Sequence, residues 1–588
     1  MTQSIRDPQE RYFTTSDKAE LFFRHWPCAD NQTKRIIILF HRGHEHSGRL
    51  QHIVDELDMP NTTFYAWDAR GHGLSSGDRG HSPSLARSVQ DVDEFVKFVA
   101  YDANVDIADI IVIAQSVGAV TVATWVHDYA PKIRGMVLAS PAFKVKLYVP
   151  FARHGLALMK HFRGLFYVNS YVKGKYLTHD PLRVASFAND ELITRPIAVN
   201  ILLELYKTAE RIVADAQAIT VPTQLLISGD DFVVHRKPQL NFYQGLRSAI
   251  KEQHILPGFY HDTLGEQKRE IAFEKMRCFI EKLYREPRHE FNYQQEDNFS
   301  PSADEWRTLQ APPANYSLLG LSYRLLRIGM NTLGRCSKGV RIGFDTGFDS
   351  GSTLDYVYRN QPQGSALIGK LIDYNYLNSI GWKGIRVRKQ HIEQLIVKGV
   401  EQLKAKNMPV NVVDIAAGHG RYVLDALEHV EGVSHILLRD YSEHNVNEGQ
   451  QKIKERHLEH LVTFEQGNAF EYEQLASLTP TPTLGIVSGL YELFPENDNI
   501  RRSLAGLAAA IPEGGILVYT GQPWHPQLQT IAWTLTSHRN GTPWLMRVRT
   551  QGEMDALVEE AGFEKCEQLI DEFGIFTVSL AVRKRHES

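Results

Sequence analysis

A buried strand that breaks into a helix at a serine is the first place in this sequence where covalent chemistry is expected. The apolar run at 109–114 leads into Ser116, Val117 and Gly118, and a helical pattern follows. Small neighbours allow a sharp turn that exposes the serine hydroxyl at the carboxyl end of the strand. The usual form is G-x-S-x-G, and Ala114 replaces the first glycine. Because the motif is short, a serine that only caps the helix is the alternative.

Further segments supply partners for this serine in an order that favours catalysis. Asp231 follows an apolar run at 223–228, and His261 lies on a later loop ahead of a helix. A serine of ordinary pKa needs an imidazole base within hydrogen-bonding distance, and the base needs a carboxylate to fix its tautomer. Asp230 is the alternative acid, but Asp231 has the better spacing to the valine pair that follows. The sequence therefore predicts a Ser-Asp-His triad.

Two glycine-containing segments extend this pattern. Residues 41–49 read HRGHEHSGR and are similar to the H-G-x-G-E-H-S-x-R segment of monoglyceride lipases and lysophospholipases. Residues 68–75 read DARGHGLS and match that family's D-x-x-G-H-G-x-S stretch, which we interpret as structural support. The resemblance implies an α/β-hydrolase fold over residues 1–285, with a helical cap inserted at about 144–215.

The same resemblance implies an oxyanion hole. In that family two backbone N–H groups stabilise the tetrahedral intermediate, and the matching positions are Gly43 and Val117. The sequence departs from the family at Arg42 and His44, where glycine is usual. The three histidines of this segment raise metal binding as an alternative. Their spacing is not helical and no acidic cluster accompanies them, so we expect no metal site.

A second strand-to-helix turn, in the other half of the chain, is rich in glycine. Asp414, Ala416, Gly418 and Gly420 form the pattern D-x-A-x-G-x-G. Such a turn lets the backbone approach a ligand, with helix N–H groups ready to bind polar atoms. A dinucleotide fingerprint would need a small residue at Val423, which disfavours NAD. The pattern resembles motif I of class I S-adenosylmethionine-dependent methyltransferases.

The resemblance extends to the strands that follow and implies a Rossmann-like fold over residues 316–588, with a helical N-terminal extension. It implies S-adenosylmethionine as cofactor, with Asp440 accepting hydrogen bonds from the ribose and Asn468 near the adenine. No N-P-P-Y-like tetrapeptide follows the fourth strand, which disfavours amino-methylation of nucleic acids. The methyl acceptor is not identified. By position alone, the acceptor-site candidates are Tyr491, Glu492, Gln522, Trp524 and His525.

Composition and charge set limits on the rest. The 588 residues exceed what one core supports, and we interpret the polar segment 286–315 as a linker. A net charge of -4 gives no electrostatic reason to expect a nucleic-acid partner. The four cysteines lack metal-ligand spacing, and the sequence shows neither a signal peptide nor a long apolar run. We expect a soluble, cytoplasmic protein, with membrane association as an alternative.

Two segments bear on lipids. The cap region at 144–215 mixes aromatic and aliphatic residues with Arg, His and Lys, so it suits an acyl chain and an anionic head group. A helical cap packed on the core is an equally good interpretation, and the two are compatible. The basic segment 321–343 has apolar residues at near-helical spacing. We expect a helix packed on its domain there, with a peripheral membrane contact as the alternative.

Together these patterns predict a bifunctional α/β enzyme. The first half is expected to hydrolyse carboxylic esters, with monoacylglycerols or lysophospholipids as the favoured substrates. The second half is expected to transfer a methyl group from S-adenosylmethionine to an unknown small acceptor. The alternative is an active hydrolase whose second domain binds the cofactor without turnover, or serves only as a scaffold.

Overall fold

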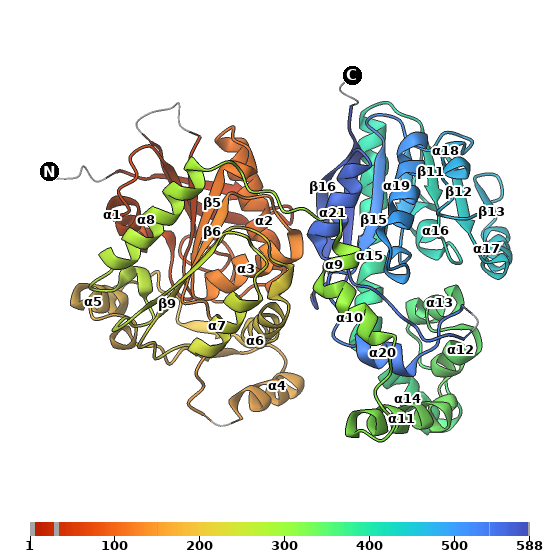
Figure 1. Ribbon diagram of the computed structural model, residues 1–588, viewed down its shortest axis with the longest axis horizontal. Coiled ribbons are helices and arrows are strands. Elements are labelled where there is room, and N and C mark those ends of the chain that lie inside the picture. Colours follow the sequence, from red (N-terminus) through yellow and green to blue (C-terminus); the bar gives the residue numbers. More distant parts are fainter. Residues whose placement is uncertain (1–5, 29–33, 150, 540, 586–588) are drawn as a thin grey trace. The chain divides into compact units, whose positions relative to one another are not determined.

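The computed structural model describes residues 6–28, 34–149, 151–539 and 541–585. The chain divides into two compact units, Met1–Phe291 and Asn292–Ser588, and each is built on its own sheet (Figure 1). No helix in the described part of the chain has the length and hydrophobicity that a membrane span requires.

The first unit contains an eight-stranded sheet with the order β1-β2-β4-β3-β5-β6-β9-β10. The strands from β4 to β10 pair in parallel, whereas β2 pairs antiparallel with β1 and β4. Every residue of the five central strands is buried, as expected of parallel strands covered by helices on both faces. The strands are β1 (Gln9–Thr14), β2 (Glu20–Trp26), β3 (Ile36–Phe40), β4 (Thr63–Trp67), β5 (Ile110–Gln115), β6 (Gly135–Ala139), β9 (Thr223–Ser228) and β10 (Lys251–Leu256).

Helices flank this sheet and carry the apolar residues that cover it. α1 (Gln51–Glu56) and α8 (Glu270–Arg285) share one core with β3 and β5. α2 (Leu85–Asp102) and α3 (Val117–Tyr129) pack against each other beside the sheet (Figure 1). The remaining elements outside the cap are η1 (Ser47–Arg49), η2 (Ile107–Asp109), η4 (Ala216–Ala218), α7 (Arg236–Gly245) and η5 (Thr263–Gly265).

The predicted cap region, inserted between β6 and β9, is mostly helical. Its longest helix, α6, buries one apolar face, whereas α4 buries none of its residues. The cap therefore combines a helix packed on the unit with one that stands in solvent. Its elements are α4 (Ala152–Arg163), β7 (Tyr167–Asn169), η3 (Gly174–Tyr176), α5 (Pro181–Asn189), β8 (Pro196–Ala198) and α6 (Val199–Ala214).

The second unit contains a seven-stranded sheet with the order β13-β12-β11-β14-β15-β17-β16. The first five strands of this order are parallel, and β17 pairs antiparallel with both β15 and β16. This is the Rossmann-like arrangement that the sequence predicts. The strands are β11 (Val410–Asp414), β12 (Val433–Asp440), β13 (Val462–Gln466), β14 (Leu484–Val487), β15 (Ile516–Gly521), β16 (Phe563–Ile570) and β17 (Thr577–Arg583).

Helices surround this second sheet, and a further set precedes it in the chain. Around the sheet lie α15 (Ile380–Ala405), α16 (Arg421–Leu427), α17 (Glu443–Glu455), α18 (Tyr472–Ala476), η7 (Tyr491–Leu493), α19 (Asn497–Ala510), α20 (Leu528–Thr534) and α21 (Gln551–Glu560). The preceding extension, helical as expected, consists of α11 (Leu318–Asn331), η6 (Leu333–Cys336), α12 (Lys338–Thr346), α13 (Gly351–Arg359) and α14 (Ala366–Leu377).

Residues 286–315, expected to be a linker, are largely folded, and the expectation is wrong for their central part. α9 (Glu296–Phe299) and α10 (Pro301–Leu309) belong to the second unit. Arg547, whose guanidinium is buried, donates to the first carbonyl of α9 at 2.8 Å, and Trp533 donates to the last carbonyl of α10 at 3.0 Å. The polar composition of the segment gave no sign of these helices. They are stabilised by hydrogen bonds from buried donors elsewhere in the unit.

α11 also differs from the expectation of a packed helix. Gly320 is its one buried residue, and its leucines are exposed. Tyr323 and Arg327 attach the opposite side of α11 to Trp533, through a ring contact and a 2.6 Å hydrogen bond. The helix therefore rests on the unit along a narrow line and leaves an apolar side uncovered.

Candidate active sites

The turn between β5 and α3 places Ser116 in a strained conformation, with φ 55° and ψ -115°. Left-handed backbone is rare for a residue with a side chain, and this turn directs the buried Ser116 hydroxyl toward His261. At Gly118, an added Cβ would lie 2.3 Å from the backbone oxygen of His41. Ala114, the departure from the usual motif, lies inside β5 as a regular strand residue. A glycine is therefore required after the serine and not before it.

We expect Gly118→Ala to lower the free energy of unfolding by about 1–3 kcal/mol, because its methyl group would overlap a backbone oxygen. Ester hydrolysis should fall with it, since relief of the clash must move the turn or the loop at His41. Thermal unfolding and initial rates measure both effects. Gly155→Ala in α4 is the matched control, because nothing lies within 4 Å of its added Cβ. Equal effects of the two substitutions would contradict this role of Gly118.

The three predicted triad side chains lie in one hydrogen-bonded series. Ser116 Oγ is 2.7 Å from His261 Nε2, and His261 Nδ1 is 2.7 Å from Asp231 Oδ2. The other carboxylate oxygen of Asp231 accepts the N–H groups of Val233 and Val234 at 2.7 and 2.9 Å. Burial opposes ionisation of Asp231, but His261 and these N–H groups outweigh it and lower the pKa. The carboxylate is therefore charged and can fix the histidine tautomer.

Asp230, the alternative acid, points elsewhere. Its side chain accepts the N–H of Gly258 at 2.9 Å, and the residue is exposed. The structure thus brings Asp231, and not Asp230, to the histidine.

The two expected oxyanion-hole residues are neighbours. A Cβ added to Gly43 would lie 3.1 Å from Val117 Cγ2, so the loop after β3 adjoins the first residue of α3. N–H groups in the first turn of a helix have no partner within the helix and can donate to an anion. Arg42 does not crowd this region, because its buried guanidinium donates to Glu45 at 2.7 Å. His44 keeps the glycine-like conformation, with φ 72°.

The histidines of this loop have separate partners. His41 Nε2 accepts the N–H of Ala69 at 2.9 Å, His44 Nδ1 is 2.5 Å from the carbonyl oxygen of Thr194, and His46 Nε2 is 3.0 Å from Asp190. Burial lowers the pKa of His44 to about 4. Among the residues that the structure describes, no group of His, Cys, Asp and Glu is arranged to hold a metal ion.

The segment 68–75 supports the site, and Asp68 is its centre. This buried carboxylate accepts the N–H of Ser47 at 2.6 Å and that of Leu74 at 2.8 Å. A Cβ on Gly73 would overlap the Asp68 carboxylate, at 2.0 Å from Oδ2. The segment therefore ties the loop after β4 to the loop after β3 and does no visible chemistry itself.

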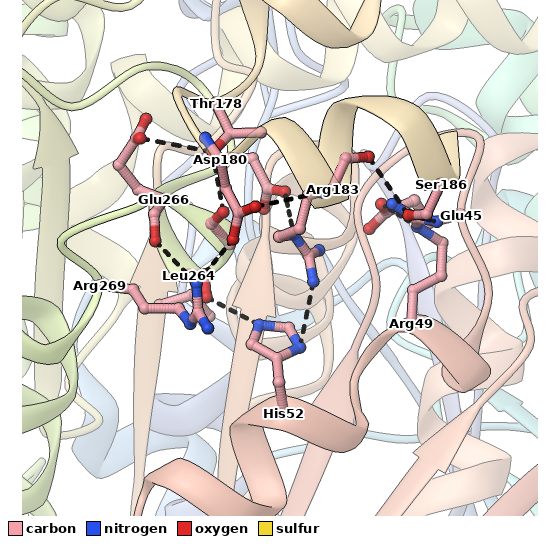
Figure 2. A network of polar contacts seen from close by, with 12 residues as sticks. Glu45, Arg49, His52, Thr178, Asp180, Arg183, Ser186, Leu264, Glu266 and Arg269 are labelled. Atoms are coloured by element: carbon pink, nitrogen blue, oxygen red, sulfur yellow. Dashed lines mark hydrogen bonds and ion pairs between the residues drawn. The ribbon is translucent and has the colours of Figure 1, made fainter. Parts of the chain in front are cut away.

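A buried ion network that the sequence did not reveal joins the cap to the histidine loop. Asp262, next to His261, accepts hydrogen bonds from Gln115 at 3.0 Å and from Arg183 of α5 at 3.1 Å. Burial raises the pKa of Asp262, but Arg183 and Arg42 outweigh it and hold the pKa below its usual value. Figure 2 shows Arg183 projecting from α5 into this network.

Further polar contacts fasten the same part of the cap. Arg269 donates to Asp180, and Arg49 donates to Ser186 and Glu45 (Figure 2). α5 is therefore anchored to the loops of the site. The sequence offered one sign of this network, the position of Asp262 directly after His261. Its partner Arg183 is distant in the chain and could not be paired with it from the sequence.

In the second unit, a pocket lies at the carboxyl end of β11. Gly418 lines it with φ +57°, and an added Cβ there would meet only the Cα of Gly351, at 3.8 Å. Two other lining residues, Arg388 and His419, are buried, and the Nε of the first and the Nε2 of the second have no hydrogen-bond partner in the described part of the chain. A glycine with space around it and buried polar atoms that lack protein partners suit a polar ligand.

The predicted cofactor residues divide between the pocket and its support. Ala416 and Gly418 line the pocket. Asp414 is fully buried, accepts the N–H of Ala416 at 3.1 Å and contacts the hydroxyl of Tyr422. It therefore stabilises the turn and does not line the pocket. Burial raises the pKa of Asp414 to about 7. Gly420 caps α16 in the left-handed conformation, with φ 71°.

Asp440 and Asn468 lie at the ends of the next two strands, beside the motif. Asp440 accepts N–H groups from Gly418 and Ser442 at 2.9 Å each and the Asn445 side chain at 3.0 Å. A carboxylate has about four acceptor positions, so both ribose hydroxyls can bind only if a protein donor gives way. Asn468 Oδ1 accepts the N–H of Phe470 at 3.0 Å and thereby shapes its turn.

Two acceptor-site candidates are buried in the second unit. The hydroxyl of Tyr491 donates to Ser503 at 2.9 Å. The amide of Gln522 lies 3.9 Å from the sulfur of Met546. Both remain candidates by position after a strand end.

The other three candidates follow β14 and β15 in the chain. Glu492 lies 3.5 Å from Arg388, which lines the pocket. Trp524 is half-buried in an apolar cluster with Trp382. His525 accepts the N–H of Gln527 at 3.0 Å, and burial lowers the pKa of this histidine to about 4. His525 is therefore neutral at physiological pH.

Comparison with known families decides the identity of the second unit. Residues 276–583, more than half of the chain, match the family model described as "Putative methyltransferase". The chain belongs to this methyltransferase family. Residues 31–268 match a second model, "Serine aminopeptidase, S33". The expected pairing of an α/β-hydrolase fold with a Rossmann-like methyltransferase fold is confirmed.

Members and relatives cover different parts of the chain. The uncharacterised protein YnbC of Escherichia coli K12 is 66% identical over 582 residues, which are 99% of this chain and 100% of YnbC. Phospholipase YtpA of Bacillus subtilis is 25% identical over 263 residues, 44% of this chain and 98% of its own. The monoacylglycerol lipase of Mycolicibacterium smegmatis is 25% identical over 43% of this chain and 89% of its own.

Among solved structures, the monoacylglycerol lipase of Paleococcus ferrophilus matches 47% of this chain and 99% of its own, with 20% identity and a TM-score of 0.40. The methyltransferase family member described here is thus an enzyme that combines a lipase-related hydrolase unit with a methyltransferase unit.

Proposed function

We propose that the first unit hydrolyses carboxylic esters by covalent catalysis, with Ser116 as nucleophile, His261 as general base and Asp231 as the carboxylate that orients it. The observation that carries this is the unbroken series of two 2.7 Å hydrogen bonds joining the three side chains. A serine hydroxyl is a weak nucleophile at its ordinary pKa, and this geometry lets the imidazole take its proton as it attacks.

The chemical steps follow from this arrangement. Ser116 Oγ adds to the ester carbonyl carbon as its proton passes to His261, and the N–H groups of Gly43 and Val117 stabilise the resulting oxyanion. His261 then gives the proton to the departing alcohol, which leaves an acyl-enzyme. Water, deprotonated by the same histidine, cleaves the acyl-enzyme and restores the free serine and a carboxylic acid.

Lipid esters such as monoacylglycerols or lysophospholipids are the proposed substrates. Relatives of the first unit include a phospholipase and monoacylglycerol lipases. The cap also presents an apolar and basic helix to solvent: Phe162 of α4 is 79% exposed, beside Lys160 and Arg163. Such a helix suits contact with acyl chains and anionic head groups. α5, by contrast, is fixed by Arg183, so α4 is the part of the cap that is free to meet a lipid.

For the second unit we propose S-adenosylmethionine as cofactor and methyl transfer to an unidentified small acceptor. When bound, the cofactor supplies an electrophilic methyl group on its sulfonium. The turn at Ala416 and Gly418 would let the backbone lie close to it. The Nε of Arg388, which has no hydrogen-bond partner in the described part of the chain, would donate to an anionic group such as the cofactor's carboxylate. Asp440 and Asn468 would bind the ribose and adenine, while Asp414 and Gly420 hold the turn in shape.

Transfer itself needs alignment more than acid–base help, because the methyl group is already activated. Glu492 and His525 carry the carboxyl and imidazole groups among the acceptor-site candidates, and burial keeps His525 neutral. A second unit that binds the cofactor without turnover, or serves only as a scaffold, is the alternative proposal.

The substrate proposal predicts a strong dependence on acyl chain length. We expect kcat/KM for p-nitrophenyl octanoate to exceed that for the acetate by at least about 100-fold, since each buried methylene contributes roughly 0.8 kcal/mol. Initial rates across the series from acetate to palmitate measure this, with Ser116→Ala as the background control. A maximum at acetate would contradict a lipid substrate, and faster cleavage of aminoacyl p-nitroanilides would favour a peptidase.

A further inference from the structure

An uncovered apolar surface lies on the helical extension of the second unit, away from its pocket. On α11 the leucines and isoleucine at 318, 321, 325 and 328 follow helical spacing along one side, and Leu325 is 59% exposed. The opposite side of the same helix is the one that Tyr323 and Arg327 attach to the unit. Packing within the unit therefore does not account for this stripe.

A neighbouring helix continues the surface. On α14, Leu367, Leu371 and Tyr374 are 83%, 61% and 55% exposed, whereas Gly369 and Asp373 on its other side are buried. η6, which carries the 67% exposed Leu333, contacts both α11 and α14 and so joins them (Figure 1). We call the exposed residues of α11, η6 and α14 the α11–α14 face. Contiguous apolar surface of this kind marks an interaction site.

The charges around the face are mostly basic. Residues 316–344 contain five Arg or Lys residues and no Asp or Glu, and one of them, Arg335, lies 3.7 Å from the exposed Asp345. Arg324 lies beside the stripe of α11, and Lys370 lies on α14; both are exposed. Basic side chains that flank an apolar helical face suit the interface of a membrane with anionic lipids, where each contributes a favourable interaction. A second copy of the same face would instead bring like charges together.

We propose that the α11–α14 face docks on the surface of an anionic phospholipid bilayer, with its leucines among the acyl chains and its Arg and Lys residues at the head groups. No helix crosses the bilayer in this arrangement. The docking concerns the second unit and is independent of both proposed activities and of α4 in the cap.

Sedimentation of the full chain with vesicles tests this docking. We expect binding to phosphatidylcholine vesicles that contain phosphatidylglycerol, weaker binding to phosphatidylcholine alone, and a decline with added salt. The double variant Leu325→Glu with Leu371→Glu should lose binding by about tenfold or more, because it removes apolar contacts from both helices. Leu182→Glu is the matched control, since this leucine of α5 is 81% exposed in the other unit.

Hydrolysis of p-nitrophenyl acetate and the thermal unfolding profile should be unchanged in the double variant, which shows that it is folded. A charge-only variant, Arg324→Glu with Lys370→Glu, should lose the preference for phosphatidylglycerol. The docking is overturned if the leucine variant binds vesicles as the wild type does while Phe162→Glu abolishes binding, which would leave the cap as the lipid contact. It is also overturned if the wild type sediments as a dimer that the leucine variant dissociates.

Discussion

Ser116→Ala is expected to lower kcat/KM for p-nitrophenyl ester hydrolysis by about 10⁴-fold or more, and to abolish labelling by a fluorophosphonate probe. The alanine lacks the Oγ atom that lies 2.7 Å from His261 Nε2 and acts as the nucleophile. Without this oxygen no acyl-enzyme can form. Loss of the hydroxyl should leave the fold intact, because the turn is held by Gly118 against the loop at His41. Initial rates and in-gel fluorescence measure the two effects.

Neighbouring acids provide the sharpest control for this triad. Asp231→Asn should lower kcat by about 10³- to 10⁴-fold, because an amide no longer fixes the histidine tautomer. Asp230→Asn, one residue away, should stay within about twofold, since Asp230 is exposed and its carboxylate accepts the N–H of Gly258 and not a proton of His261. Persistent labelling of the Ser116→Ala variant, or equal losses in the two aspartate variants, would contradict the assignment.

Gly418→Arg is expected to abolish binding of S-adenosylmethionine. Gly418 has a positive φ and its Cβ side faces the pocket, so an arginine there would strain the turn and fill the space of the ligand. Asp440→Ala should weaken binding as well, because the carboxylate fixes the N–H of Gly418 at 2.9 Å in addition to any contact with the ribose. Titration calorimetry measures both variants.

A matched substitution at a glycine outside the pocket distinguishes backbone strain from filling of the ligand site. Gly541 also has a positive φ, +68°, and an added Cβ there would meet open space. Gly541→Arg should therefore bind S-adenosylmethionine as the wild type does. If it lost binding to the same extent as Gly418→Arg, general destabilisation would explain both, and the pocket assignment would fail.

The central strands of both sheets could be predicted because buried parallel strands are continuous apolar runs, as in β5 and β11. Three strands of the eight-stranded sheet could not be predicted in this way. β1 and β10, the edge strands, expose or only partly bury all but one residue each, Phe13 and Leu256. β2, between β1 and β4, combines buried apolar residues with Glu20, Arg24 and His25.

In the candidate sites, residues that follow strand ends could be predicted, whereas residues that reach a site from a distant helix could not. Ser116, Asp231 and His261 could be predicted because each follows a strand end in a fixed order along the chain. Arg183 and Arg388 could not, because each reaches its site from a helix whose sequence gives no sign of its neighbours. Asp414 and Tyr491 are both buried, which sequence position alone does not reveal.

The central claim is that one chain carries two separate active sites, and calorimetric titration of the full chain with S-adenosylmethionine tests it most directly. We predict that wild type and Ser116→Ala each bind about one equivalent with the same affinity, because the cofactor pocket is built entirely from residues of the second unit. The absence of any binding heat in both proteins would contradict a cofactor site and favour the scaffold alternative.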